Sequence, residues 1–489
     1  MARKTIKKER DFIANITDWF HSRRQPLRLL SYPIILGLVG TCSFSPNLLE
    51  QVIELGELHV ITIDGPTTFY QDGNGMVGPE YDLVAGLAES LDVKLVIKTV
   101  SKITDIQLAL EAGHGHLAAA GLTPTENWQK VMSFGYPYAT VDTHLIYKRG
   151  TVKPKSIEDV IGRDIEITSE SNHHNTLNNL KKDHPELSWS INTQVGVREL
   201  LNKVNREEVD FTIADSNEFA LQRHIQPELR IAMNLKKNNK LAWAYRQDNS
   251  RRLREHADNF LIAAEREGDL AQINERYYGY AESLNYVDTR TFIEHIKSRL
   301  PDFREMFVEA GRSNNVDWRL LAAIGYQESH WQPRAISRTG VRGIMMLTRI
   351  TAKELNIDNR LDPANSIFGG AEYFMKQWER LPNEIAEPDR SWFALAAYNV
   401  GFSHLKDAWQ ITQWQGNDPN QWANVSKSLP LLASELWYPY LSHGYARGWE
   451  PVIYVNNIRS YYDILTNLIE VESPQKMALN KPLNLSDAL

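Results

Sequence analysis

The strongest constraint on the fold is a change of residue pattern partway along the 489-residue chain. From about residue 57 to residue 280, short runs rich in β-branched residues alternate with helical periods, as in "LHVITI" (58–63) before a helical stretch at about 81–91. Strands that alternate with helices predict a mainly parallel sheet with helices on both faces. A segment of this length predicts two lobes rather than one.

Beyond about residue 288 nearly every segment has helical periodicity, and nine of the thirteen tryptophans lie after residue 290. We therefore place a domain boundary in "AESLNYVDTR" (281–290). The predicted organisation is a two-lobed α/β domain at 46–285, an all-helical domain at 286–472 and a polar tail at 473–489.

The first 45 residues have the pattern of an export signal or an N-terminal anchor. Residues 1–28 carry eight Lys or Arg against three acids, and an apolar run of fourteen residues (29–42) follows. Such a run is shorter than the roughly 20 residues of a membrane-spanning helix, and a basic segment before it is typical of export. The alternative is a buried helix of the first domain. Export predicts a periplasmic protein that is peripheral to the outer membrane or anchored by its N-terminus.

Cys42 is the only cysteine, so the chain forms no intramolecular disulfide. Cleavage of the signal, lipidation of Cys42 and retention as an anchor all stay open.

The formal net charge of −7 argues against a nucleic-acid partner, because proteins that bind nucleic acids present a basic face. No metal-ligand cluster is evident from the spacing of His, Cys, Asp and Glu.

The stretch "LLAAIGYQESHW" (320–331) places a carboxylate on an apolar helix face. At about 100° per residue, Glu328 lies between Leu321 and Ile324 on the helix surface. A structural carboxylate could leave the core through a frayed last turn or pair with a buried Arg. A functional one could be a general acid, since poor solvation of the charged form raises the pKa of a carboxyl.

Three further motifs follow in order, and together they are specific. They are Gly343–Ile344–Met345–Met346, Ala397–Tyr398–Asn399 and Tyr454–Val455. With Glu328–Ser329 before them, residues 290–470 resemble the soluble-type lytic transglycosylases, which have a lysozyme-like all-helical domain. Met346 stands where that family usually has Gln. A membrane-bound branch of the family has Met-rich versions of this motif, and "NYVDTRTF" (285–292) and "YARG" (445–448) also resemble that branch.

The resemblance implies cleavage of the glycan strands of peptidoglycan without a cofactor. Glu328 would protonate the oxygen that links N-acetylmuramic acid to N-acetylglucosamine. It would then accept the proton of the muramyl C6 hydroxyl as that oxygen closes onto C1. One carboxylate then suffices, whereas ordinary glycosidases need two. Other acids of the domain, Asp362, Glu372 and Glu379, have the sequence contexts of solvated residues.

The resemblance also implies substrate contacts around the acid. Ser329 would hydrogen-bond near the acid or near an N-acetyl group of the substrate. Met345 and Met346 would line the substrate, and the latter offers an apolar wall in place of an amide. The remaining implied contacts are Tyr398 and Tyr454, which would fix the sugar, and Asn399, which would orient a neighbouring group. The sequence leaves both sugar stacking and core packing open for three tryptophans, Trp331, Trp392 and Trp449.

The first domain resembles the family 3 periplasmic solute-binding proteins, which bind amino acids between two lobes. The stretches that carry the resemblance are "GPEYDLVAGLAESL" (78–91), "HLAAAGLTPTENWQKVMSFGYPY" (116–138) and "VDFTIADS" (209–216). Trp128 stands where that family has an Arg for the ligand's α-carboxylate, and Asp215 would face the α-amino group. The resemblance therefore does not imply a free amino acid held in the usual way. It implies a cationic, peptide-like, muropeptide or amino-acid-like ligand, or no ligand. Lobe closure could regulate the second domain.

Two other functions fit the same residues. A hydrolase of the goose-lysozyme type would use Glu328 with an activated water. A solute receptor would use the helical domain only to hold the cell wall.

Overall fold

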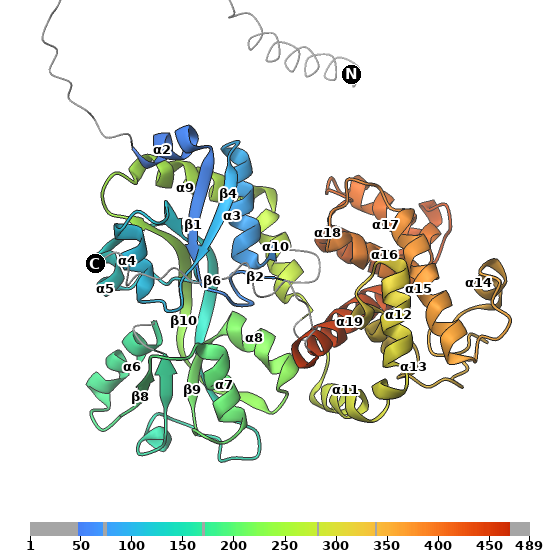
Figure 1. Cartoon of the computed structure of the whole chain (residues 1–489), viewed down its shortest axis with the longest axis horizontal. Coiled ribbons are helices and arrows are strands. Elements are labelled where there is room, and N and C mark those ends of the chain that lie inside the picture. Colours follow the sequence, from blue (N-terminus) through green and yellow to red (C-terminus); the bar gives the residue numbers. More distant parts are fainter. Residues whose placement is uncertain (1–46, 72–75, 169–171, 281–282, 338–339, 470–489) are drawn as a thin grey trace, which may run out of the picture. The chain divides into compact units, whose positions relative to one another are not determined.

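The computed structural model describes residues 47–71, 76–168, 172–280, 283–337 and 340–469. The predicted export segment (1–45) and the predicted tail (473–489) lie outside the described residues. An α/β domain comes first in these ranges, and a helical domain follows (Figure 1). Within the described ranges, no helix has the length and apolar content that a membrane crossing requires.

The main sheet of the first domain has six strands in the order β4-β1-β5-β10-β6-β9. In one half, β1 (Glu57–Thr62) pairs in parallel with β4 (Lys94–Thr99) and β5 (Leu117–Ala118). In the other half, β10 (Leu229–Arg246) is antiparallel to β5 and β6 (Met132–Lys148), and β6 is antiparallel to β9 (Thr212–Asp215). The prediction of a mainly parallel sheet is therefore wrong for this half.

The physical reason is the length of β6 and β10. Their 17 and 18 residues run through both lobes (Figure 1). "LRIAMNL" and "KLAWAYR", which have the pattern of two separate strands, are the two ends of β10. Several register shifts between β6 and β10 interrupt the alternation of buried residues, and this hides the continuous strand from pattern reading.

Each lobe has its own apolar core. The first lobe packs around Leu58, Val60 and Trp243, and the second around Leu145, Ile167 and Phe211. The helices and short strands of the first lobe are α2 (Leu48–Leu55), β2 (Tyr70–Gln71), β3 (Met76–Val77), α3 (Pro79–Ser90), α4 (Asp105–Glu111), α5 (Glu126–Gln129), α9 (Arg251–Glu267) and α10 (Asp269–Tyr278). Those of the second are β7 (Glu166–Thr168), α6 (Asn172–Asp183), β8 (Ser190–Asn192), α7 (Val197–Asn205) and α8 (Ser216–Ile225).

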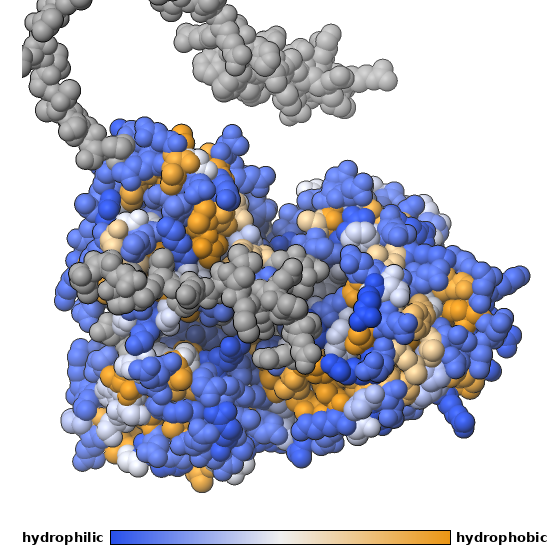
Figure 2. All heavy atoms as spheres, viewed as in Figure 1, coloured by the Kyte–Doolittle hydropathy of each residue, from blue (hydrophilic) through white to orange (hydrophobic). Residues whose placement is uncertain are grey.

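The second domain is built from helices, and its described residues contain no strand element. Its helices are α11 (Tyr286–Ser298), α12 (Arg304–Asn314), α13 (Trp318–Ser329), α14 (Arg349–Glu354), α15 (Pro363–Glu379), α16 (Asp389–Val400), α17 (Phe402–Trp414), α18 (Trp422–Ser428) and α19 (Trp449–Leu468). One continuous core includes Phe307, Ile324 and Phe393. The face in Figure 2 is mainly hydrophilic over both domains, as 24% charged residues would predict.

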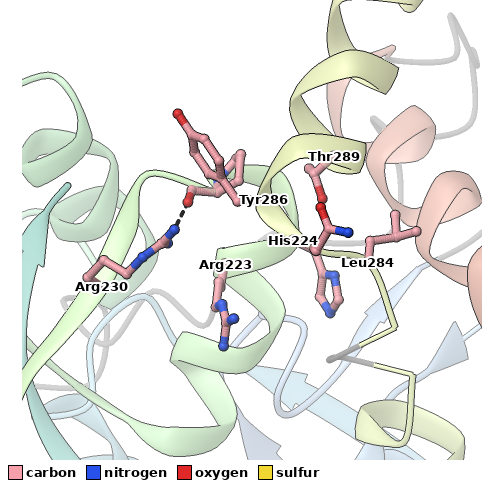
Figure 3. Close-up of a pocket in the computed structure, with 8 residues that line it drawn as sticks. Arg223, His224, Arg230, Leu284, Tyr286 and Thr289 are labelled. Atoms are coloured by element: carbon pink, nitrogen blue, oxygen red, sulfur yellow. Dashed lines mark hydrogen bonds between the residues drawn. The ribbon is translucent and has the colours of Figure 1, made fainter. Parts of the chain in front are cut away.

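A small hollow lies where α8 and β10 meet the start of α11 (Figure 3). Its volume is about 20 Å³, room for a water molecule but not for a sugar. The guanidinium groups of Arg149 and Arg230 lie 4.3 and 5.4 Å from the centre of the Tyr286 ring. Both are cation–π contacts, and Tyr286 and Arg230 line the hollow.

Candidate active site

Helix α13 carries the candidate acid at its C-terminal end. The helix begins after Asp317, whose side chain accepts a hydrogen bond from the main-chain N–H of Arg319 at 2.9 Å, as the sequence predicts for a helix cap. It ends at Ser329, and the next two residues, His330 and Trp331, have left-handed backbone conformations, with φ of 52° and 57°. Two consecutive non-glycine residues in this region cost free energy, and such strain tends to occur at functional sites.

Glu328 is half-buried and has one hydrogen-bond partner in the described structure. The hydroxyl of Tyr454 in α19 donates to its Oε1 at 2.6 Å. Burial raises the pKa of Glu328 to about 7, and the hydrogen bond from Tyr454 offsets part of that rise. No Lys, Arg or His forms an ion pair with Glu328 among the described residues. A carboxyl that keeps its proton near neutral pH has the property that a general acid needs.

The loop at 343–346 lies directly beside the end of α13. The Ser329 hydroxyl donates to the carbonyl of Ile344 at 2.8 Å, and the Tyr398 hydroxyl donates to the carbonyl of Met345 at 2.9 Å. The main-chain N–H of Met345 donates to Ser366 Oγ at 3.1 Å. Three of the four sequence motifs therefore meet through these bonds, and the fourth, at Tyr454, meets Glu328 directly.

Three tyrosines line up next to the acid. The rings of Tyr398 and Tyr454 are stacked with centroids 6.5 Å apart, and Tyr373 contacts Tyr398 edge-on at 5.0 Å. Such aromatic surfaces suit the apolar faces of sugar rings. Sequence reasoning missed Tyr373, although it lies in "SIFGGAEYF" (366–374), where the two glycines of α15 signal a close approach. A Cβ on Gly370 would lie 2.5 Å from Met345.

Three expectations from the sequence need correction or refinement. The Met345 side chain is fully buried in the core, so only its main chain lies at the site. The hydroxyl of Ser329 bonds to main-chain carbonyls, so this residue positions the 343–346 loop. Trp331 is 1% exposed and its indole donates to the carbonyl of Ala322, which makes it a core residue.

The other predicted contacts differ in exposure. Met346 is half-buried with φ of 47°, at the exposed end of the motif. Asn399 is exposed at the end of α16, and no hydrogen bond from its side chain occurs within the described residues. Trp449 is 42% exposed at the start of α19. The half-buried Trp392 packs against the core, with the Arg459 guanidinium 5.1 Å from its ring centre.

A second carboxylate is not brought to Glu328 by any hydrogen bond in the described structure. Asp362 caps α15 by accepting from the N–H of Asn365, and Glu372 pairs with Lys376 at 3.4 Å. Both of these carboxylates therefore have partners of their own.

The first domain contains a separate cleft of about 420 Å³ between its lobes. Both residues predicted for ligand binding, Trp128 and Asp215, line this cleft. Trp128 is buried in α5, and the cleft lining also includes one arginine, Arg198. The Thr143 hydroxyl donates to Asp215 at 2.6 Å, and His173 Nε2 lies 3.5 Å from the same carboxylate.

A cluster of ionisable groups in this cleft was not evident from the sequence. His173, Asp215 and Glu218 place one ligand-type atom each within 4.8 Å of one another, although they come from α6, β9 and α8. Burial lowers the pKa of the His173 imidazole, but the Asp215 and Glu218 carboxylates together raise it, and the net shift is upward. Asp215 and Glu218 also form the capping box of α8, which gives both carboxylates a structural role.

Comparison with known proteins matches both domains. Residues 58–280 match the family model of the bacterial extracellular solute-binding proteins, family 3, and residues 305–421 match that of the transglycosylase SLT domain. A membrane-bound lytic murein transglycosylase F of Ectopseudomonas mendocina is 45% identical over 441 residues, 90% of each chain. One of Pseudomonas putida strain F1 is 44% identical over 88% of this chain and 89% of its own.

The chain belongs to the membrane-bound lytic murein transglycosylase F family. Membership in this family confirms both resemblances drawn from the sequence, including that to the membrane-bound branch. Among solved structures, an arginine-binding protein from T. maritima covers 47% of this chain and 99% of its own, with 20% identity and a TM-score of 0.43.

For this transglycosylase F relative, the pH dependence of lysis tests the electrostatics of the acid. A general acid at Glu328 must be protonated to act, so on this hypothesis kcat/KM should fall as pH rises through about 7. The Tyr454 hydroxyl stabilises the carboxylate, so Tyr454→Phe should raise the pKa of Glu328 and move this fall to higher pH. The matched control is Tyr462→Phe, which removes a hydrogen bond from α19 to Asp317 instead. A Tyr454→Phe profile identical to that of the control would contradict the assignment.

Proposed function

We propose that this protein cleaves the β-1,4 bond between N-acetylmuramic acid and N-acetylglucosamine in peptidoglycan and leaves 1,6-anhydro ends. The observation that carries the proposal is Glu328, a half-buried carboxyl whose pKa is raised to about 7 and whose one protein partner is Tyr454. The names of the relatives support the same reaction class.

Glu328 acts twice in this reaction. The protonated carboxyl first gives its proton to the glycosidic oxygen, and the bond from that oxygen to the muramyl C1 breaks. The resulting carboxylate then takes the proton of the muramyl C6 hydroxyl while the C6 oxygen bonds to C1. Tyr454 donates to Oε1 and stabilises the carboxylate between the two steps. No water is consumed, and Glu328 ends the cycle protonated.

The masses of the products test this reaction. Purified protein should release muropeptides that are lighter by one water than the products of a hydrolase, because the C6 oxygen replaces water at C1. Products with reducing ends would contradict the anhydro proposal and favour a hydrolase of the goose-lysozyme type. The absence of any soluble product would favour the receptor function.

For the first domain, we propose that the cleft binds a cationic or peptide-like ligand such as a muropeptide. The acidic groups Asp215 and Glu218 line the cleft, and Trp128 occupies the position of the carboxylate-binding Arg. Calorimetric titration of the full chain with muropeptides and with free amino acids tests this. We expect the wild type to bind muropeptides and the Asp215→Asn variant to lose this binding. Equal heats of muropeptide binding for the wild type and the variant would contradict the proposed cleft ligand.

The same relatives support a place in the cell envelope. We propose export to the periplasm and association with the envelope membrane through the N-terminal segment. Fractionation that leaves the protein in the cytosol would contradict this proposal.

A further inference from the structure

Three ionisable side chains converge in the lining of the cleft of the first domain. His173 comes from α6, Asp215 from the end of β9 and Glu218 from α8, and all three line the cleft. One ligand-type atom of each residue lies within 4.8 Å of those of the other two. All three elements belong to the second lobe (Figure 1), so the cluster is complete without any residue of the first lobe.

The spacing of the imidazole and its nearer carboxylate resembles that of two ligands on one metal ion. His173 Nε2 lies 3.5 Å from Asp215 Oδ1. A charge-assisted hydrogen bond between a nitrogen and a carboxylate is shorter, about 2.7–2.9 Å. Two ligands of a tetrahedral Zn²⁺, each about 2.0–2.1 Å from the ion, lie roughly 3.3 Å apart. The observed separation is closer to the second value than to the first.

The helix cap formed by the two carboxylates leaves capacity for an ion. Glu218 Oε2 accepts a hydrogen bond from the main-chain N–H of Asp215 at 2.9 Å, and no hydrogen bond to Glu218 Oε1 is found among the described residues. The Thr143 hydroxyl donates to Asp215 Oδ1 at 2.6 Å, and such a bond orients a carboxylate that also ligates a metal. A carboxylate has about four lone-pair sites, so capping and ligation are compatible.

An amide oxygen without a partner lies in the same network. Asn172 is 9% exposed and lines the cleft directly before His173. Its Nδ2 donates to Thr143 Oγ1 at 3.4 Å, whereas its Oδ1 is buried and has no hydrogen-bond partner in the described structure. Exchanging the two amide atoms would not satisfy the oxygen, because the one proton of the Thr143 hydroxyl goes to Asp215. A buried acceptor without a donor is costly, and a nearby cation would lower that cost.

The ligand atoms indicate which kind of ion would bind. An imidazole nitrogen is a good ligand for Zn²⁺ and other first-row transition ions, whereas Ca²⁺ and Mg²⁺ prefer oxygen ligands alone. Two ionised carboxylates carry two negative charges, which a divalent ion would neutralise. Three protein ligands leave one position of a tetrahedral ion open, as in zinc sites that bind a further molecule.

We propose that His173, Asp215 and Glu218 form a site for a first-row divalent cation of the Zn²⁺ type in the cleft of the first domain. The open position of the ion would accept a carboxylate of a cleft ligand. The ion would thus add a positive charge to that of Arg198 in a cleft where Trp128 offers none. The site is independent of the proposed lytic reaction, because Glu328 and its partners take no part in it.

Titration with the metal alone tests the site. The full chain is stripped with a chelator, freed of it by gel filtration and titrated with ZnCl₂ in a calorimeter, and the wild type should bind one equivalent tightly. His173→Gln and Glu218→Gln should each weaken this binding by about 100-fold, at or beyond the upper end of what loss of an outer-shell partner costs. The matched control is His174→Gln, the next residue of α6, whose ring packs against Trp189. It should keep the wild-type affinity.

The two variants alter different elements, α6 and α8, and Gln at position 218 keeps an oxygen for the helix cap, so the result does not depend on one substitution. Circular dichroism checks that each variant is folded before titration. A wild type without a tight equivalent of Zn²⁺, or wild-type affinity in both variants, would overturn the site. Binding of Ca²⁺ as tight as that of Zn²⁺ would overturn the role of the imidazole. Since the readout is metal binding, it is separate from the product analysis that tests lysis.

Discussion

Glu328→Gln should lower the rate of anhydro-product release by about 10³-fold or more, because the same group acts as acid and as base. Gln matches the shape of the side chain and can still accept the hydrogen bond from Tyr454, but it has no proton to give at neutral pH. Quantifying anhydro-muropeptides from purified sacculi by mass spectrometry measures this. A variant that retains more than a tenth of the wild-type rate would exclude Glu328 as the acid.

Unfolding measurements separate this loss from a loss of fold. The pKa of Glu328 in the folded protein is raised from 4.5 to about 7, so folding favours the protonated form. This contribution to stability is present at low pH and is lost as pH rises toward about 7. Glu328→Gln should therefore be at least as stable as the wild type above pH 7. Lower stability there would mean that lost activity reports on folding.

Gly343→Ala should lower activity by about 100-fold and destabilise the helical domain by about 3 kcal/mol. Gly343 has φ of 87°, and a Cβ there would lie 1.9 Å from the carbonyl oxygen of Arg360 and 2.6 Å from Ser366 Oγ. The loop would have to move, and with it the carbonyls that Ser329 and Tyr398 hold. Small displacements of positioning groups strongly reduce catalysis.

Gly340→Ala is the matched control for this substitution. Gly340 also has a positive φ, 81°, but no atom lies within 4 Å of a Cβ built on it. This variant carries the backbone strain alone, worth about 1 kcal/mol, and should keep most of its activity. Thermal unfolding and lysis assays on both variants measure the difference. Equal losses in the two would show that strain, and not the contact with Arg360, makes Gly343 necessary.

Local patterns predicted much of the helical domain. An Asp just before a helix and a Gly just after one are typical cap and stop residues, and the structure has Asp317 and Gly401 at such positions. The sheet was harder to predict from the sequence. Strands β6 and β10 pair over their whole length with several register shifts, and local periodicity does not reveal such pairing. Local patterns therefore predicted a parallel sheet, whereas the half of the sheet that contains β10, β6 and β9 is antiparallel.

The sequence by itself determined that a carboxyl group sits on an apolar helix face at Glu328 and that three ordered motifs follow it. Helical periodicity and residue type suffice for that conclusion. Only the tertiary structure decided what surrounds the carboxyl. Tyr454 lies 126 residues further along the chain yet donates to Glu328, and Met345 turns into the core while its carbonyl meets Tyr398. Such contacts depend on how distant helices pack, and neighbouring residues in sequence carry no information about that packing.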